Sequence, residues 1–336
     1  MKDEKEITNL TNLKPRHSQE IHETNQCIDD FEPLSKQLEE DGYLLLRGLV
    51  DVELVATIKE DILSILRKRN ISEDDGTSEP LWSGGPPPTD DEYMAVYDSI
   101  SSLKSLKDLA ESPDIVKVMA GLLGSSVQVW QQLICRMIFP DPQGRAPMGL
   151  NGHQDANPKF GYMVRNFYTC WLPLMEIDAN LGGLEIAPGS HKKGILVHPG
   201  TLASSTEEAK KREAGLAAED FEWVSSDYQP GDAVIFTSLT VHRGSPNQSD
   251  RIRLSCDFRY QAQGEWTNWM SNASGPECRR VSQQIDAVIN SRALYVTTGA
   301  QGEILEEIRR RMLEEKNMNL QRAQQLVVEI QGQRKA

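Results

Sequence analysis

Two short segments far apart in the chain constrain the fold most, because each carries a histidine in sequence with strand character. The first is His153-Gln154-Asp155, in which residues two apart point to the same side if the segment is extended. The second is His242, which ends the apolar run 233–241 and is followed by the turn signal Arg243-Gly244. If the three side chains act together, the fold has to bring two distant strands side by side.

Two imidazoles and one carboxylate form the ligand set that holds non-haem Fe(II) and leaves coordination positions open for substrate and O₂. We therefore predict a metal site made of His153, Asp155 and His242. The competing histidine is His191, which follows Pro188-Gly189-Ser190 and is better explained as part of a turn. The remaining histidines lie in polar or loop-like sequence and are not expected to bind metal: His17, His22 and His198.

An alternating stretch, 251–260, follows soon after His242. Alternate residues share one face of a strand, and that face carries Arg251, Arg253, Ser255, Asp257 and Arg259. A guanidinium can bind a carboxylate through two parallel hydrogen bonds, so it can hold the far end of a dicarboxylic acid whose near end chelates the metal. 2-Oxoglutarate is such an acid. Arg251 is the predicted partner and Arg253 the alternative, and the simpler explanation for either is an ion pair with Asp257 or a solvated strand face.

At this point the chain resembles the phytanoyl-CoA dioxygenase family of Fe(II)/2-oxoglutarate oxygenases. The matching segments fall roughly between residues 37 and 262 and are 41–48, 151–155, 182–192 and 247–251. The resemblance implies that His153, Asp155 and His242 bind Fe(II) and that Arg251 binds the 5-carboxylate of 2-oxoglutarate.

The resemblance also implies roles for residues that line the cosubstrate site. Trp171 matches a tryptophan of that site, although it could equally be a core residue, and Met137 matches a methionine upstream of it. One departure follows the distal histidine. Many members carry a serine two residues after it that touches the cosubstrate, whereas in this chain Ser245 comes one residue later.

The fold and reaction follow from the same resemblance. The expected fold is mainly β with flanking helices, built on a double-stranded β-helix, or jelly-roll, of the cupin-like kind. The expected reaction consumes 2-oxoglutarate and O₂, releases succinate and CO₂, and hydroxylates a small organic substrate. Because Asp155 supplies a carboxylate where related halogenases leave room for chloride, hydroxylation, desaturation or a related oxidation is favoured over halogenation.

Two alternatives belong to other functional classes. A cupin-like metalloenzyme that does not use 2-oxoglutarate would bind metal through the same ligands, but it would leave Arg251 and Trp171 without a role. A catalytically silent binding or scaffold protein would be expected to have lost one of the ligands, and all of them are present.

The chain divides into three predicted parts. Residues 1–30 are polar and form a flexible N-terminal arm, 31–262 form the dioxygenase domain, and 263–336 form a helical C-terminal extension. Within the domain we expect a strand at 43–46, a strand at 127–139, and helices at 51–69 and 113–123.

Several peripheral segments have open roles. Residues 70–92 are rich in Gly and Pro, so we expect no regular structure there, and a lid over the site is one hypothesis. Residues 201–220 are predicted to be a helical insertion. The helix expected at 303–330 either packs on the barrel or makes a homodimer contact.

Composition limits the partners. The net charge of −14 speaks against nucleic acid and anionic membranes, because both require a basic face. The five cysteines, an odd number without paired spacing, suggest reduced thiols. With no signal peptide or membrane span in the sequence, we expect a cytoplasmic enzyme acting on a small molecule.

Overall fold

The computed structural model describes residues 19–21, 23–24, 30–141, 152–156, 166–194 and 221–264, together with scattered positions between 307 and 329. The predicted insertion at 201–220 lies outside the described residues, as does most of the predicted arm at 1–30. The helix predicted at 303–330 is described only at scattered positions, of which Met312 and Leu326 are buried.

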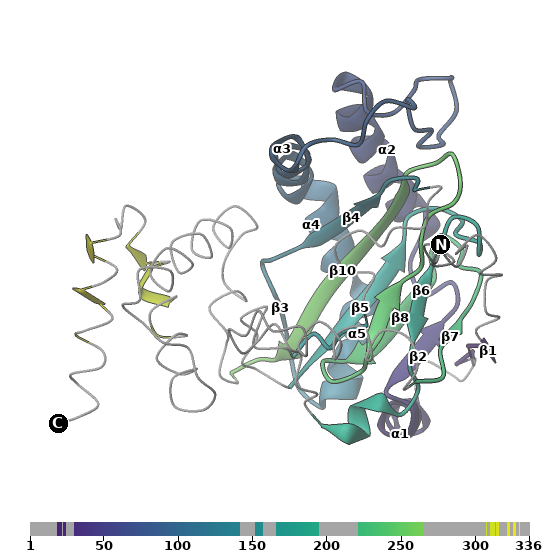
Figure 1. Ribbon diagram of the computed structural model, residues 1–336. Helices are drawn as coiled ribbons and strands as arrows, with labels where there is room; N and C mark the ends of the chain where they lie inside the picture. Colours follow the sequence, from purple (N-terminus) through teal and green to yellow (C-terminus); the bar gives the residue numbers. More distant parts are fainter. Residues whose placement is uncertain are drawn as a thin grey trace, which may run out of the picture.

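Two sheets form the core of the described chain (Figure 1). The larger has the order β2 (Tyr43–Leu46), β8 (Ala233–Thr237), β5 (Phe167–Pro173), β10 (Arg253–Ala262) and β3 (Val127–Val129), and β4 (Ile134–Ile138) also pairs with β10. The smaller has the order β1 (Gln19–Glu20), β7 (Val224–Ser225), β6 (Leu184–Ile186) and β9 (His242–Gly244). All these pairings are antiparallel except that of β1 with β7.

Among residues 30–141, five α-helices flank the larger sheet: α1 (Phe31–Asp41), α2 (Val52–Lys68), α3 (Asp90–Ser101), α4 (Lys104–Ala110) and α5 (Pro113–Leu123). Their ends follow the local sequence. Asp51 caps α2 by accepting a hydrogen bond from the amide of Glu53, and Pro113 and Gly124 bound α5 as a first-turn proline and a left-handed C-cap. The helices predicted at 51–69 and 113–123 are therefore confirmed, and so is the strand at 43–46.

The larger sheet has two different buried faces. The outer face of β10 carries Leu254, Cys256, Phe258 and Tyr260, and the Tyr260 hydroxyl donates a hydrogen bond to the carbonyl of Ala110 at the end of α4. The inner face of β10 carries the alternating polar residues, and these are also buried: Arg253, Ser255, Asp257, Arg259 and Gln261. Burying charge on an inner face is costly unless the charges are paired or bind a ligand, so this face marks the functional interior.

The smaller sheet faces this polar side. Phe236 of β8 and His242 of β9 pack with their ring centroids 4.4 Å apart. Two antiparallel sheets that face each other, with helices on the outside of one, form the jelly-roll with flanking helices that the sequence predicted. No helix of the described residues is long and apolar enough to cross a bilayer.

Two segments that the sequence presents as continuous are each interrupted by a turn in the structure. The strand expected at 127–139 is broken at 130–133, where the amide of Trp130 donates to the carbonyl of Arg259 and the chain turns between β3 and β4. The apolar run 233–241 is not one strand: β8 ends at Thr237, a turn follows, and His242 opens β9 in the opposite sheet. Thr240 holds the turn, because its amide donates to the Thr237 carbonyl and its hydroxyl to the Gly42 carbonyl.

The segment 70–92 is more structured than predicted. α3 begins within it, at Asp90, and isolated bridges join Ser72 to Trp82 and Leu81 to Arg251. The amide of Ile252 also donates to the carbonyl of Pro80. Backbone pairing therefore fixes this segment to the residues that lead into β10.

Candidate metal centre

His153 and His242 face each other through their backbones. Each amide donates a 3.0 Å hydrogen bond to the other residue's carbonyl, which is the pairing of two antiparallel neighbours. Directly opposed residues on antiparallel strands place their side chains on the same side, and the two imidazole centroids lie 4.3 Å apart. The distant segments are thus joined as the sequence required.

Asp155 does not continue a strand, contrary to the prediction. His153 makes only an isolated bridge, and Asp155 and Ala156 lie in a turn. The turn is fixed by the amide of Ala156, which donates to the carbonyl of Ser238, and by the side chain of Gln154, which donates to the carbonyls of Gly194 and Leu239. The turn, rather than strand alternation, brings the carboxylate beside the imidazoles.

The three side chains converge in a way that suits a metal ion. One potential ligand atom from each of His153, Asp155 and His242 lies within 4.8 Å of the others. The Nε2 atom of His242 is 3.9 Å from Oδ1 of Asp155, and both side chains are buried. Two imidazole nitrogens and one carboxylate oxygen match the donor set of the Fe(II) facial triad.

The protonation states of His242 and Asp155 favour metal binding. Burial lowers the pKa of His242 despite the opposing effect of the Asp155 carboxylate, so its imidazole is neutral near pH 7. Its Nδ1 atom lies 3.1 Å from the Thr240 carbonyl oxygen. A proton on Nδ1 would be donated to that carbonyl, which leaves the Nε2 lone pair for a metal.

Two neighbours hold the Asp155 carboxylate. The Thr169 hydroxyl donates to Oδ2 at 2.6 Å, and Nη2 of Arg259 donates to Oδ1 at 3.1 Å. Burial alone would raise the pKa of Asp155, but Arg259, the two histidines and Thr169 outweigh it, so the pKa lies below its ordinary value. Sequence alternation predicts Arg259 on this face but gives it no role, and no sequence signal points to Thr169.

The structure separates the two candidate arginines. Arg251 precedes β10, is part of the bridge to Leu81, and forms a 2.9 Å ion pair with Glu79, in which the two side chains are 27% and 41% exposed. Arg253 is the first residue of β10 and is buried on the inner face. Its guanidinium donates to the carbonyl of Gly182, and burial lowers its pKa to about 10.

Gly182 packs so closely against the backbone of residues 245–246 that a side chain would not fit there. Gly182 has a φ of +78°, and a Cβ atom there would lie 2.4 Å from the Pro246 carbonyl oxygen and 2.7 Å from that of Ser245. Nη1 of Arg253 points at three carbonyl oxygens of these two segments, those of Gly182, Gly183 and Ser245. The Nε atom of Arg253 is buried and has no hydrogen-bond partner among the described residues.

The register places the last two predicted residues on opposite faces. Trp171 pairs with Asp257 and so lies on the inner face, where it packs edge-on against Tyr228 with centroids 4.8 Å apart. Met137 pairs with Leu254 and so lies on the outer, helix-covered face. Contrary to the prediction for Met137, its side chain therefore lies on the face opposite to the one that carries Arg253 and Trp171, because neighbouring residues of a strand point to opposite faces.

His191, the competing ligand, lies outside the triad. It belongs to the short 3₁₀ helix Ser190–Lys193, and its Nε2 atom is 2.9 Å from the carbonyl oxygen of Glu39. This contact joins the turn to α1, in the supporting role that the sequence predicted.

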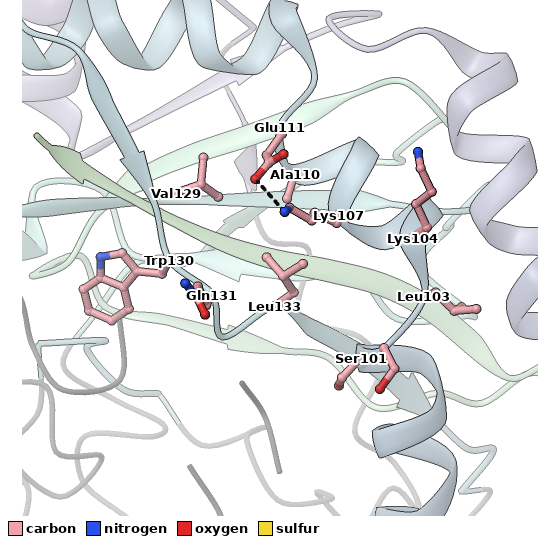
Figure 2. A pocket seen from close by; sticks show the side chains of 11 residues that line it. Ser101, Leu103, Lys104, Lys107, Ala110, Glu111, Val129, Trp130, Gln131 and Leu133 are labelled. Atoms are coloured by element: carbon pink, nitrogen blue, oxygen red, sulfur yellow. Dashed lines mark ion pairs between the residues drawn. The ribbon is translucent and has the colours of Figure 1, made fainter. Parts of the chain in front are cut away.

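A separate hollow of about 490 Å³ lies between α4 and the segment that links β3 to β4 (Figure 2). Its walls include Lys104, Lys107, Trp130 and Leu133, but none of the triad. Lys107 pairs with Glu111 at 3.8 Å, and Lys104 pairs with Asp108. Both ammonium groups therefore have a carboxylate partner close by in the sequence, and the hollow is separate from the triad.

Comparison with known proteins agrees with this geometry. The family model described as phytanoyl-CoA dioxygenase matches residues 38–255. A 1-deoxypentalenic acid 11-beta-hydroxylase from Streptomyces exfoliatus is 32% identical over 248 residues, which cover 70% of this chain and 82% of the relative. The peroxisomal phytanoyl-CoA dioxygenase of Homo sapiens is 23% identical over 241 residues, 66% of each chain.

Among solved structures, apo EctD from S. alaskensis covers 78% of this chain and 88% of its own, with a TM-score of 0.50 and 18% identity. At that identity the likeness concerns the fold, and it supports the jelly-roll assignment. A cupin-like enzyme without 2-oxoglutarate would share the donor set and the fold, so the family match decides between the alternatives, and it supports the 2-oxoglutarate-dependent dioxygenase. The chain therefore belongs to the phytanoyl-CoA dioxygenase family of Fe(II)- and 2-oxoglutarate-dependent oxygenases, and it is a hydroxylase of that family.

Proposed function

We propose that this enzyme hydroxylates a small organic acid, with Fe(II) held by His153, Asp155 and His242 and 2-oxoglutarate held by Arg253. The observation that carries the cosubstrate assignment is the buried guanidinium of Arg253, which has carbonyl partners but an Nε atom without one among the described residues. A buried cation is costly unless an anion accompanies it, and the 5-carboxylate of 2-oxoglutarate is such an anion.

The assignment to Arg253 replaces the prediction of Arg251. The Arg251 side chain is engaged by Glu79 at the protein surface, whereas Arg253 starts the strand that also carries Arg259, the partner of Asp155. An anion bound by Arg253 therefore lies in the same interior as the metal ligands. Trp171 forms part of the wall of that interior in this proposal.

When bound, Fe(II) activates O₂ in a reaction coupled to decarboxylation of 2-oxoglutarate to succinate and CO₂. The protein's own residues perform three other tasks. Arg253 orients the cosubstrate, the carbonyl of Thr240 keeps the proton of His242 on Nδ1, and the rings of Phe236 and Trp171 exclude water from the interior.

The acidic nature of the substrate is supported by charge. Among the described residues, Arg253 and Arg259 are buried on the inner face with Asp155 and Asp257, and Arg136 lies at the margin of this face, where its partly exposed side chain pairs with Asp257. Bound Fe(II) adds positive charge and 2-oxoglutarate offsets it, so an excess of positive charge remains for an anionic substrate. The Streptomyces relative is itself named for an acid substrate.

A substrate screen tests this proposal. Purified enzyme with Fe(II) and 2-oxoglutarate is offered a panel of aliphatic and alicyclic carboxylic acids, each paired with its methyl ester, and succinate and the oxidised product are measured together. We expect product in proportion to succinate for one or more acids and little for the matched esters. Equal turnover of acids and esters would contradict the acid class, and no stimulation of succinate by any acid would also count against it.

We further propose a cytoplasmic location and a homodimer contact through the C-terminal helix. The first is supported by the free, buried thiols of Cys135, Cys170 and Cys256, which suit a reducing compartment. Light scattering of the full chain and of a chain ending at residue 302 tests the second: we expect two chains per particle for the full chain and one for the truncated chain, and an equal number of chains per particle in both would contradict the contact.

A further inference from the structure

We propose that Arg259 and Thr169 are positioning residues that set the orientation of the Asp155 carboxylate and thereby the affinity of the site for a divalent metal. This inference rests on the proposed metal site and adds two residues to it. Neither residue is proposed to contact the substrate or the reacting atoms.

The two residues form a matched pair across the larger sheet. Arg259 of β10 and Thr169 of β5 are directly opposed in the antiparallel register, so their side chains rise from the same inner face. Thr169 donates to one carboxylate oxygen of Asp155 at 2.6 Å and Arg259 to the other at 3.1 Å. Two residues of the larger sheet thus donate hydrogen bonds to both carboxylate oxygens of Asp155, whose own backbone lies in a turn.

Burial strengthens these two hydrogen bonds, because they are shielded from water. The side chain of Arg259 is 2% exposed and that of Asp155 is 3% exposed, so water cannot replace either contact. A buried carboxylate keeps its orientation only through such partners, and partners of metal ligands commonly govern affinity by orienting those ligands.

The oxygens have different surroundings. Oδ1, which accepts from Arg259, is the oxygen that lies 3.9 Å from Nε2 of His242, whereas Oδ2 accepts from Thr169. Arg259 therefore acts on the oxygen nearest the second ligand, and two opposite effects follow from removing it. The carboxylate would lose its fixed orientation, which weakens metal binding, and the metal would lose a repelling cation, which strengthens it.

Orientation is expected to dominate. The Arg259 charge is largely neutralised by the carboxylate it contacts, so its repulsion of a metal is reduced, whereas a carboxylate turned away from His242 is lost as a ligand altogether. Loss of such a partner typically weakens metal binding by about 10- to 100-fold. We expect that range for Arg259→Met and a smaller loss for Arg259→Lys, which keeps the charge but not the planar fork.

The experiment measures Co(II) affinity by competition with a chromophoric chelator, without cosubstrate or turnover. The variants are Arg259→Met, Arg259→Lys, Thr169→Val and Thr169→Ser, and Arg47→Met is the control because Arg47 forms an ion pair with Asp232 outside the metal site. Thr169→Val removes the hydroxyl at nearly constant shape, and Thr169→Ser restores it. We expect weaker Co(II) binding in Arg259→Met and Thr169→Val, recovery in Thr169→Ser, and wild-type affinity in Arg47→Met.

Unchanged or tighter Co(II) binding in folded Arg259→Met would overturn the role of Arg259. If that variant does not fold, as judged by circular dichroism, the comparison of Thr169→Val with Thr169→Ser decides, and equal Co(II) affinities of these two variants would overturn the proposal. The Co(II) absorption spectrum provides a second readout, because a reoriented carboxylate changes the ligand field whereas a general loss of stability does not. Failure of the wild-type protein to bind Co(II) would instead refute the proposed metal site itself.

Discussion

Replacing Arg253 by Gln tests which arginine holds 2-oxoglutarate. The guanidinium is buried on the inner face of β10, where a hydrogen bond from a charged group is worth about 1.5–3 kcal/mol. Loss of one such bond corresponds to a rise of roughly 10- to 150-fold in the dissociation constant for 2-oxoglutarate. Because the cosubstrate is proposed to make two parallel bonds, the upper half of this range is expected.

The matched control is Arg251→Gln. This change removes an ion pair with Glu79 whose partners are substantially exposed, and such pairs contribute about 0–1 kcal/mol to stability. We expect the dissociation constant for 2-oxoglutarate to stay within about twofold of the wild-type value, because the interior is untouched.

The assay is an anaerobic titration of the Fe(II) form with 2-oxoglutarate, followed by the visible absorption of the ternary complex. Iron content is measured in parallel, so that a lost cosubstrate site is distinguished from a lost metal site. Circular dichroism checks that Arg253→Gln is folded, since Gly182 loses its donor in that variant. A larger effect in Arg251→Gln than in Arg253→Gln would refute the reasoning and return the role to Arg251.

Three further predictions concern the scaffold. Gly42→Ala should lower the free energy of unfolding by about 2 kcal/mol in urea titrations, because φ is +84° and the new Cβ would lie 2.4 Å from Nδ1 of His191; an unchanged midpoint would contradict this. Met137→Leu should leave the 2-oxoglutarate dissociation constant within about twofold, since the side chain faces the helices, and a tenfold rise would place it in the site. Limited proteolysis should leave the bonds around Leu81 intact in the free enzyme, because that residue is bridged to Arg251; rapid cleavage that substrate suppresses would favour a lid.

The helices and the triad residues could be read from the sequence because local signals specify them. Pro113 and Gly124 mark the two ends of α5, and the structure has the helix between them. The distinction between His242 and His191 also came from local context, since a turn sequence surrounds His191.

The choice of arginine could not be made in the same way. Alternation placed Arg251 and Arg253 on one face, but it does not specify where the strand begins. In the structure β10 starts at Arg253, and Arg251 pairs with Leu81 from a distant loop. Strand ends of this kind are decided by long-range pairing.

Register explains the other differences. Met137 follows an apolar run that predicts a strand, yet only its pairing with Leu254 determines which face it occupies. The contact between Thr169 and Asp155 joins a strand to a turn, and Arg259 reaches the same carboxylate from another strand. Such contacts depend on how the sheets assemble, and no short motif contains them.

The most direct test of the account is the iron content of anaerobically reconstituted protein after removal of free metal. We predict about one Fe(II) per chain for the wild type and for His191→Ala, and little for His242→Ala or Asp155→Ala. The same samples should form succinate from 2-oxoglutarate only where iron is retained. Loss of iron in His191→Ala together with full occupancy in His242→Ala would contradict the proposed metal centre.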